Sequence, residues 1–520
     1  MGVGSIAERG VRTSRWRPVA LWHDIAGEPA LAAVAALVVA GAALRFYGLN
    51  HQGYWYDEAN TVFLVRHSFG QMLGVLPSNE STPPFYYCLA WLWTQVLGSG
   101  EAGLRSLSAL SGVLVIPVAY ALGAAAATRR VGLVLAALVA FNPLLIWYSQ
   151  EARAYALMVL LTAVTLLALA RAARRPEPRP VAAWAVTSGL ALTTHYYAVL
   201  VVAPQALWLL WQHRRRRAVQ VAVAAIVACG LALIPLALSQ NGTHRDRWIS
   251  RAPLGPRVNQ LIPHVLIGPG VPDRPLVKFI AFAAALAGLA LLALRANGAE
   301  RRPAAAAGLL VLTGVGMSFA FVLAGYDGLI TRNLIALTVP VLVVLAAGFG
   351  ARRAGHLGLL AAGVLCAMGL IAAVGVAADR DLQRPDWRPL IRMLGPPPRH
   401  APGRALIVQH YHMLLPLSLY MRGLRRIDPR IGARVNQIDV IAISSPRVGT
   451  CWWGAACNLR STQPQSSYPF RGFHFAWRRR VLQFTVEHFV SRHPVRIRAA
   501  TVAPVLTETR LGKDDFLYQR

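Results

Sequence analysis

Charged residues are scarce in this 520-residue chain, and lysine is almost absent. Only 14% of the residues are charged, Lys278 and Lys513 are the only lysines, and 22 acidic residues stand against 53 basic ones. Soluble domains carry about 25% charged residues, and disordered chains lack apolar ones. Here 55% of residues are hydrophobic. This composition excludes a soluble or disordered protein, and such Ala-, Leu- and Val-rich runs do not suit a nucleic-acid-binding protein despite the net charge of +31.

Familiar catalytic signatures and most cysteines are missing too. No P-loop, dinucleotide-binding glycine fingerprint, HExxH or GxSxG motif occurs in a suitable context, which argues against hydrolysis of a cytosolic nucleotide. Of five cysteines, only Cys451 and Cys457 form a close pair, and a zinc site would need two further ligands nearby. We expect these two to form a disulfide in an oxidising compartment, with free thiols as the alternative.

What the chain has instead is a series of apolar runs. A membrane span needs about 20 apolar residues, and the sequence predicts about eleven spans, near 29–49, 104–125, 131–148, 154–171, 181–196, 198–212, 218–238, 276–294, 305–325, 333–350 and 356–378. The stretch 181–212 could also form one long helix. The N-terminal run resembles a signal peptide, but its length and the lack of a clear cleavage site favour a retained first span.

Arginine clusters alternate with these runs and indicate the orientation of the chain. The clusters on one side are Arg9 to Arg17, Arg129-Arg130, Arg171 to Arg179, Arg214 to Arg217, Arg295 to Arg302, and Arg352-Arg353. The positive-inside rule makes that side cytoplasmic. We therefore expect a multi-pass plasma-membrane protein with a basic cytoplasmic N-terminus (1–28), a membrane domain (29–378) and an extracytoplasmic tail. The outer loops would be 50–103, 149–153, 239–275 and 326–332.

The tail, residues 379–520, is predicted to be a small α/β domain. Residues 405–408 and 440–443 are short apolar runs typical of buried strands, 411–422 favours a helix, and 495–502 is a further candidate strand. The tail carries 23 basic and 9 acidic residues, a balance that favours anionic headgroups or an acidic acceptor.

The first outer loop, 50–103, is too long for a simple connector. It holds Trp55-Tyr56-Asp57-Glu58 just after a membrane exit, and a short aromatic segment near Trp93 that suits an interfacial helix. An Asp or Glu among aromatics can act as a general base or hold a divalent cation. The alternative is that these acids lie in a solvated turn or at a helix N-terminus.

Other polar residues are predicted on the same outer face. Glu151 and Arg153 lie between two spans, where ionisable groups tend to be functional, although they could simply pair with each other or reach the headgroups. His195 and Tyr196 end another span and could instead be structural or belong to the interfacial aromatic belt. Arg45 and Arg332 could clamp a lipid phosphate or merely reach the interface. This convergence, more than any single motif, indicates a site at the outer membrane boundary.

Several of these motifs together resemble the GT-C superfamily of polytopic glycosyltransferases. The similar branch is the bacterial one related to protein O-mannosyltransferases and the lipid A aminoarabinose transferase. The motifs are Leu44-Arg-Phe-Tyr-Gly-Leu-Asn50, Tyr54-Trp-Tyr-Asp-Glu58, Pro83-Pro-Phe-Tyr-Tyr87, Leu104-Arg-Ser-Leu-Ser-Ala-Leu110, Tyr148-Ser-Gln-Glu-Ala-Arg-Ala-Tyr155, Thr194-His-Tyr-Tyr197 and Asp386-Trp387-Arg388. The sequence departs from the family at Thr82, where a histidine is usual, and at Asn333, where an aromatic is common.

The resemblance implies inverting transfer of one sugar from a polyprenyl-phosphate carrier to an acceptor at the outer face of the cell envelope. Asp57 would take the proton from the acceptor hydroxyl, and Glu58 would support it or contact the acceptor. Glu151 would orient substrate or, with Asp57, a divalent cation such as Mg or Mn. Arg153 would lie near the phosphate, and Tyr56, His195 and Tyr196 near the substrates.

The partners implied are the lipid bilayer, a polyprenyl-phosphate sugar, and a protein, glycolipid or wall-polysaccharide acceptor, with no nucleic acid. Two other functions stay open. A lipid-linked-sugar flippase would need polar groups near the bilayer midplane, whereas the predicted spans are nearly free of charge there. A non-catalytic membrane scaffold that presents the outer domain is the other alternative.

Overall fold

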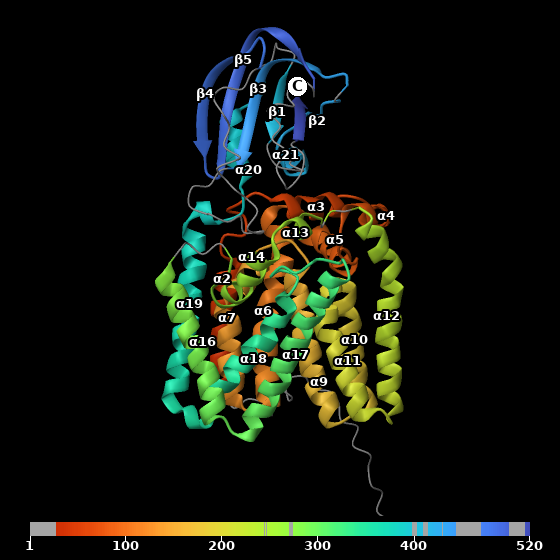
Figure 1. Cartoon of the computed structure of the whole chain (residues 1–520), viewed down its shortest axis with the longest axis vertical. Coiled ribbons are helices and arrows are strands. Elements are labelled where there is room, and N and C mark those ends of the chain that lie inside the picture. Colours follow the sequence, from red (N-terminus) through yellow and green to blue (C-terminus); the bar gives the residue numbers. More distant parts are fainter. Residues whose placement is uncertain are drawn as a thin grey trace, which may run out of the picture.

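The structure is a computed structural model that describes residues 28–243, 245, 247–269, 274–397, 403–408, 414–428, 430–443, 470–498 and 515–520. A long helical bundle carries a β-sheet on one of its ends (Figure 1). We call that end of the bundle the sheet-side end. The basic N-terminus and the pair Cys451 and Cys457 lie outside the described residues, so the expected disulfide stays a prediction.

The bundle consists of long apolar helices that run between its two ends (Figure 1). Their bounds are α2 (Glu28–Phe46), α6 (Glu101–Ala126), α7 (Arg129–Phe141), α8 (Pro143–Ser149), α9 (Tyr155–Arg174), α10 (Pro178–Thr194), η1 (Tyr196–Ala198), α11 (Val199–His213), α12 (Arg217–Asn241), α16 (Pro275–Arg295), α17 (Gly298–Leu323), η2 (Ile335–Leu337), α18 (Thr338–Phe349), η3 (Arg352–Ala354) and α19 (Gly355–Ala378).

Each of the eleven predicted apolar runs overlaps at least one of these helices, and the run 131–148 overlaps two α-helices, α7 and α8. Among the described residues, seven helices are long and apolar enough to cross a membrane, or eight if α7 and α8 are one bent span. The helices α10, α11 and α18 are shorter, at 17, 15 and 12 residues. The predicted polytopic helical fold is confirmed.

The break between α7 and α8 has a local cause. Asn142 ends α7, and its side-chain oxygen accepts the backbone N–H of Leu145 at 3.0 Å, which caps α8. Pro143 follows at the first position of α8, where its missing N–H costs nothing. The two helices are bent by 56°, and α8 leads the chain to the sheet-side end, where Glu151 and Arg153 follow.

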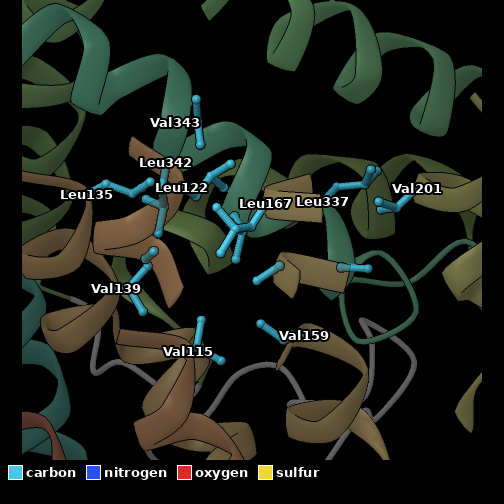
Figure 2. Close-up of a cluster of buried hydrophobic side chains, with 14 of the residues drawn as sticks. Val115, Leu122, Leu135, Val139, Val159, Leu167, Val201, Leu337, Leu342 and Val343 are labelled. Atoms are coloured by element: carbon cyan, nitrogen blue, oxygen red, sulfur yellow. The ribbon is translucent and has the colours of Figure 1, made fainter. Parts of the chain in front are cut away.

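The bundle core is formed by aliphatic side chains from many helices. Figure 2 shows part of it, where Val115 of α6, Val139 of α7 and Val159 of α9 lie near Leu337 and Leu342. Small residues allow close backbone approach, as is common between membrane helices. At Gly123 of α6 an added Cβ would lie 2.7 Å from the Cα of Gly132 in α7, so these two helices meet backbone to backbone.

Short helices lie across the sheet-side end of the bundle (Figure 1). Those of the first loop are α3 (Tyr56–Val65), α4 (Phe69–Asn79) and α5 (Phe85–Leu97), and those of the loop after α12 are α13 (Arg247–Arg251), α14 (Leu254–Asn259) and α15 (Leu261–Ile267). The aromatic segment predicted to lie along the membrane is α5. It packs with α3 and α4 in a second apolar cluster around Tyr86 and Tyr87, both fully buried.

A mixed six-stranded sheet follows the last membrane helix. After η4 (Arg380–Leu382), its elements are α20 (Trp387–Leu394), β1 (Arg404–Val408), α21 (Leu414–Tyr420), β2 (Leu424–Arg426), β3 (Ala433–Ile443), β4 (His474–Val481), β5 (Phe484–Ile497) and β6 (Asp515–Gln519). The strand order is β2-β6-β1-β3-β5-β4, and the pairing of β1 with β3 is parallel. We call α20 with its N-cap residue Asp386, α21 and these strands the sheet domain.

The predicted strands 405–408 and 440–443 are confirmed as β1 and part of β3. They are central in the sheet, and the side chains of 405–408, 440 and 441 are buried, as expected of strands that form unbroken apolar runs. The predicted helix 411–422 contains α21, with 411–413 outside the described residues. The expected strand 495–502 covers only the end of β5, and 499–502 are also outside the described residues.

Candidate active site

The two adjacent acids, Asp57 and Glu58, lie in the first turn of α3. Acidic side chains are favourable there because a helix N-terminus carries unpaired N–H groups and partial positive charge. Successive helix residues are about 100° apart around the axis. The two carboxylates therefore face different neighbours, and the simple interpretation as helix N-terminal acids describes their position but not their partners.

Glu58 is completely buried and is held by Arg105 of α6. Its Oε1 accepts Arg105 Nε at 2.7 Å, and its Oε2 accepts Nη2 at 2.5 Å. The backbone N–H of Ala152 donates to Oε1 at 2.8 Å. Burial alone would raise the pKa of Glu58, but the guanidinium outweighs it and holds the pKa below its usual value. Glu58 is thus an ionised carboxylate that joins α3, α6 and the turn after α8.

Arg105 uses its remaining donors on the segment that leads into α3. Its Nη1 donates to the carbonyls of Leu49 and Gln52 at 2.7 and 2.9 Å, and its Nη2 donates to that of Gly53 at 3.0 Å. Its side chain is 4% exposed. Every guanidinium nitrogen of Arg105 is therefore engaged, as a buried charge requires.

Asp57 pairs with Arg332, which reaches it from the loop before η2. Arg332 Nη1 donates to Asp57 Oδ2 at 2.8 Å, and the guanidinium lies over the ring of Trp248 in α13, 5.3 Å from its centre. The side chains of this pair are 17% and 18% exposed, whereas no side chain exceeds 9% in the three neighbouring pairs described here. Asp57 is the carboxylate of this cluster that a substrate can reach.

The loop that carries Arg332 is itself fixed by polar contacts. Arg257 of α14 binds Asp327 through two hydrogen bonds of 2.8 and 2.7 Å and donates to the carbonyl of Leu329 at 3.1 Å. Asn333 donates to the carbonyl of Gly328 at 2.8 Å. Asn333, which departs from the family pattern, therefore serves the loop backbone.

Glu151 pairs with Arg384, from the segment between α19 and α20, and not with Arg153. Arg384 Nη2 donates to Glu151 Oε2 at 2.6 Å, and its guanidinium stacks over Trp147 at 4.1 Å. The other oxygen, Oε1, is buried without a hydrogen-bond partner among the described residues. Burial raises the pKa of Glu151 to about 7, with Arg384 opposing the rise and the charges of Glu58 and Asp57 adding to it.

Arg153 pairs with Glu80, at the end of α4, instead of facing outward. Glu80 also accepts the side-chain amide of Asn60 at 2.6 Å. The expected place of Arg153 beside a donor phosphate stays a prediction, but its guanidinium is 9% exposed and is already committed to a carboxylate. Its role in the structure is to attach α4 to the turn before α9.

His195 and Tyr196 lie close to these pairs but are themselves buried or bound. His195 is 3% exposed, and burial, then the charges of Arg153 and Arg332, lower its pKa to about 3. It is therefore neutral at physiological pH. The hydroxyl of Tyr196 donates to Gln240 at 2.7 Å, and Gln240 donates to the carbonyl of Thr82 at 3.0 Å. Tyr196 thus supports the loop before α5.

Arg45 does not join this cluster. It is completely buried in the bundle, where Nη1 and Nη2 donate to the carbonyls of Ala140 and Val139 at 2.9 Å each. The expectation of a phosphate clamp at Arg45 does not fit this geometry, because the side chain turns into the bundle although α2 ends one residue later. Tyr56 opens α3 beside Asp57, as its place in the motif requires.

The sequence interpretation overlooked several charged residues that the structure brings in. These are Glu80, Arg105, Arg257, Asp327 and Arg384. Arg105 offered a signal, since it is an ionisable residue near the start of an apolar helix. Glu80 and Arg384 had none, because their partners are distant in the sequence.

The described donors do not suit a divalent cation. Asp57 and Glu151, the two expected ligands, are each paired with a guanidinium. No group of three His, Cys, Asp or Glu side chains that could hold a metal occurs in the part of the chain that the structure describes. We therefore derive no step through a metal.

Comparisons with known proteins concern the fold of the chain. Residues 81–239 match the family described as dolichyl-phosphate-mannose-protein mannosyltransferase. No curated protein sequence matches the chain. The solved structure of ArnT from Cupriavidus metallidurans bound to undecaprenyl phosphate is similar over 88% of this chain and 97% of that one, with 14% identity and a TM-score of 0.50. The chain has the GT-C fold.

Other solved structures are less similar. ArnT from Cupriavidus metallidurans in the apo state gives a TM-score of 0.47 with 17% identity, over 68% of this chain and 65% of that chain. The Saccharomyces cerevisiae Pmt1-Pmt2 complex bound to the sugar donor gives 0.34 with 17% identity, over 44% and 35%. The resemblance to GT-C glycosyltransferases noted in the sequence is confirmed, and the chain is a multi-pass membrane protein.

Proposed function

We propose that this protein is a membrane glycosyltransferase that moves one sugar from a polyprenyl-phosphate carrier to a hydroxyl acceptor on the extracytoplasmic face. The observation that carries the proposal is the pair Asp57–Arg332, a partly exposed carboxylate and a partly exposed guanidinium with buried ion pairs around them. A sugar phosphate already holds its leaving group, so the protein has to supply a base, positioning, and a cation for the departing phosphate.

In this mechanism Asp57 accepts the proton of the acceptor hydroxyl as its oxygen attacks the anomeric carbon. The bond from that carbon to the phosphate oxygen breaks on the opposite face, so the anomeric configuration inverts. Arg332, which offers several donors in a fixed fork, neutralises the departing phosphate. Its bond to Asp57 has to be exchanged for bonds to the phosphate, which leaves the carboxylate free to take the proton.

The carrier and the orientation are supported by two further observations. The matching family is described by its dolichyl-phosphate donor, and ArnT has been solved with undecaprenyl phosphate, so we propose a polyprenyl phosphate here. The helix ends that carry the described arginine clusters, from Arg129 to Arg353, lie opposite the sheet domain (Figure 1), as the positive-inside rule expects for an extracytoplasmic sheet. Cysteine variants at Arg215 and Ser418 should be labelled by an impermeant maleimide from opposite sides of the membrane.

The test is sugar transfer by the full-length protein in lipid vesicles. Polyprenyl phosphates carrying radiolabelled hexoses or pentoses serve as donors, and envelope fractions serve as acceptors. Asp57→Asn should lower transfer at least about 100-fold, the usual range for loss of a general base. Asp428→Asn changes a carboxylate that, among the described residues, accepts the N–H groups of Arg430 and Ile431 in a turn of the sheet domain, so it should transfer at the unmodified rate.

The results separate the proposal from its alternatives. Equal transfer by Asp57→Asn and Asp428→Asn would remove Asp57 as the base. Movement of the lipid-linked sugar across the vesicle without any transfer to acceptor would favour a flippase. Absence of both activities in the unmodified protein, with every donor and acceptor fraction tried, would favour the scaffold.

A further inference from the structure

The segment that leads into α3 is held from two sides. On the bundle side, Arg105 binds its carbonyls, as described above. On the other side lies the sheet domain, whose helix α21 packs against α3. Residues 50–55 are therefore enclosed between a membrane helix and a domain that begins more than 300 residues later in the sequence.

Two consecutive backbone N–H groups of this segment donate to the sheet domain. The N–H of Gly53 donates to Asp386 Oδ1 at 2.9 Å, and the N–H of Tyr54 donates to the hydroxyl of Tyr420 at 2.6 Å. Asp386 also caps α20 through the N–H of Arg388. One carboxylate thus serves the start of a sheet-domain helix and the backbone that precedes α3.

Tyr420 connects three elements. Its hydroxyl accepts from Tyr54 and donates to Glu101 at 2.8 Å, the first residue of α6. Burial raises the pKa of Tyr420, so the hydroxyl keeps the proton that it donates. One turn further along α6, the guanidinium of Arg105 lies 5.3 Å from the ring centre of Tyr54. Tyr420 therefore links the sheet domain to Tyr54 and to the first residue of α6.

The absence of a side chain at Gly53 permits this approach. A Cβ at that position would lie 2.9 Å from Asp386 Oδ1, 3.1 Å from the Tyr420 hydroxyl and 3.3 Å from Arg388 Cγ. The first distance is shorter than a Cβ tolerates and the other two are tight, so an added Cβ would displace the side chains of Asp386 and Tyr420 from their bonds to this segment.

We propose that Tyr420 and Asp386 of the sheet domain are positioning residues for the transfer reaction. They hold the backbone of residues 53–54, and with it the first turn of α3, so that Asp57 stands where the acceptor arrives. The inference rests on the proposed role of Asp57. It gives the sheet domain a part in the chemistry without any contact between that domain and the reacting atoms.

Hydrogen exchange tests the contact without any assay of activity. In the full-length protein, the N–H groups of Gly53 and Tyr54 are the donors themselves, so their exchange rates report their bonds to Asp386 and Tyr420. Tyr420→Phe should raise exchange at Tyr54 about tenfold, the equivalent of one lost hydrogen bond. The control is Ser418→Ala, on the same helix, whose hydroxyl donates to the carbonyl of Leu415 within that helix, and it should leave that rate unchanged.

Kinetics test the consequence. Tyr420→Phe should lower kcat about tenfold and leave KM for the donor within about twofold, because misplacement of a base by about 1 Å costs rate. Gly53→Ala, which disturbs the same contact from the other side, should reproduce both effects. A merely structural role would reduce the yield of folded protein but not kcat per folded molecule.

The outcomes test this inference separately from the proposed function. Unchanged exchange at Tyr54 in Tyr420→Phe would overturn the contact, and raised exchange with unchanged kcat would overturn the positioning role. If Asp57→Asn keeps full transfer, the proposed base fails and the positioning role fails with it. The exchange result would still show whether the sheet domain holds the segment.

Discussion

Two neighbouring regions at the sheet-side end of the bundle contain the same chemistry in different settings. The outer region is the pair Asp57–Arg332, in which both side chains are more than 15% exposed. The inner region consists of Glu58–Arg105, Glu80–Arg153 and Glu151–Arg384, in which every side chain is at most 9% exposed. Asp57 and Glu58 are adjacent in sequence, yet they belong to different regions.

The difference in exposure shows how a polar site can be built at a membrane boundary. A buried ion pair adds little net stability, but a buried charge that loses its partner is very unfavourable. The inner pairs therefore bind loops firmly to α6, α8 and α9. The outer pair is solvated enough for Arg332 to leave Asp57 when a phosphate replaces it. The inner region holds the geometry, and the outer region is free to react.

The largest expected effect comes from breaking an inner pair. Glu58→Gln leaves Arg105 buried without its counter-charge, which costs about 3–5 kcal/mol. The melting temperature in detergent, followed by tryptophan fluorescence, should fall by about 3–5 °C. Asp57→Asn should change it by less than about 2 °C. Equal losses in the two variants would erase the distinction between the regions.

The next largest effect is expected at Arg332, the cation of the outer region. Arg332→Gln should raise KM for the polyprenyl-phosphate donor about 10- to 100-fold, because a charge-assisted bond to phosphate is lost. Arg332→Lys should recover part of this, since lysine keeps the charge but not the two-point geometry. Steady-state kinetics at varied donor concentration measure KM and kcat for each variant. A fall in kcat with an unchanged KM would place Arg332 elsewhere in the reaction.

A third prediction uses the inner pair Glu151–Arg384. With its pKa raised to about 7, folded Glu151 keeps a proton between about pH 4.5 and 7 that the unfolded chain releases, so its contribution to stability falls as pH rises through that window. Glu151→Gln removes this dependence. The melting temperature of the variant minus that of the unmodified protein should increase by a few degrees from pH 5 to pH 8. A constant difference would show that Glu151 is ionised throughout.

The smallest effect concerns the support of the outer pair. Asp327→Asn weakens the bonds that Arg257 makes to the loop of Arg332. Loss of about one hydrogen bond should raise KM for the donor about two- to fivefold, with little change in kcat. Asp428→Asn again serves as the control. An effect as large as that of Arg332→Gln would mean that Asp327 itself contacts the substrate.

Much of the fold could be predicted from the sequence because its signals are local. Apolar runs of about 20 residues give the membrane helices, and arginine clusters predict which side they face. The strands 405–408 and 440–443 could also be predicted, because interior strands of a sheet form local, unbroken apolar runs. The limits of β5 were not, because its second half has exposed residues and no clear pattern.

The candidate site was predictable only as a set of residue types on one face. The acids Asp57, Glu58 and Glu151 were found because acidic residues are rare in the membrane domain. Their partners were not, since Arg332 is 275 positions from Asp57 and Arg384 is 233 from Glu151. Arg45 shows the converse error, because a position at the end of an apolar run does not reveal whether the side chain turns outward or into the bundle.

The sequence by itself determined that this is a multi-pass membrane protein with scarce acids gathered at one end, because hydrophobic length and charge bias act residue by residue along the chain. Only the tertiary structure decided which acid is buried in an ion pair and which stays accessible. That choice depends on the distance and burial of groups hundreds of residues apart, and on a sheet domain that presses Tyr420 and Asp386 against the segment before Asp57.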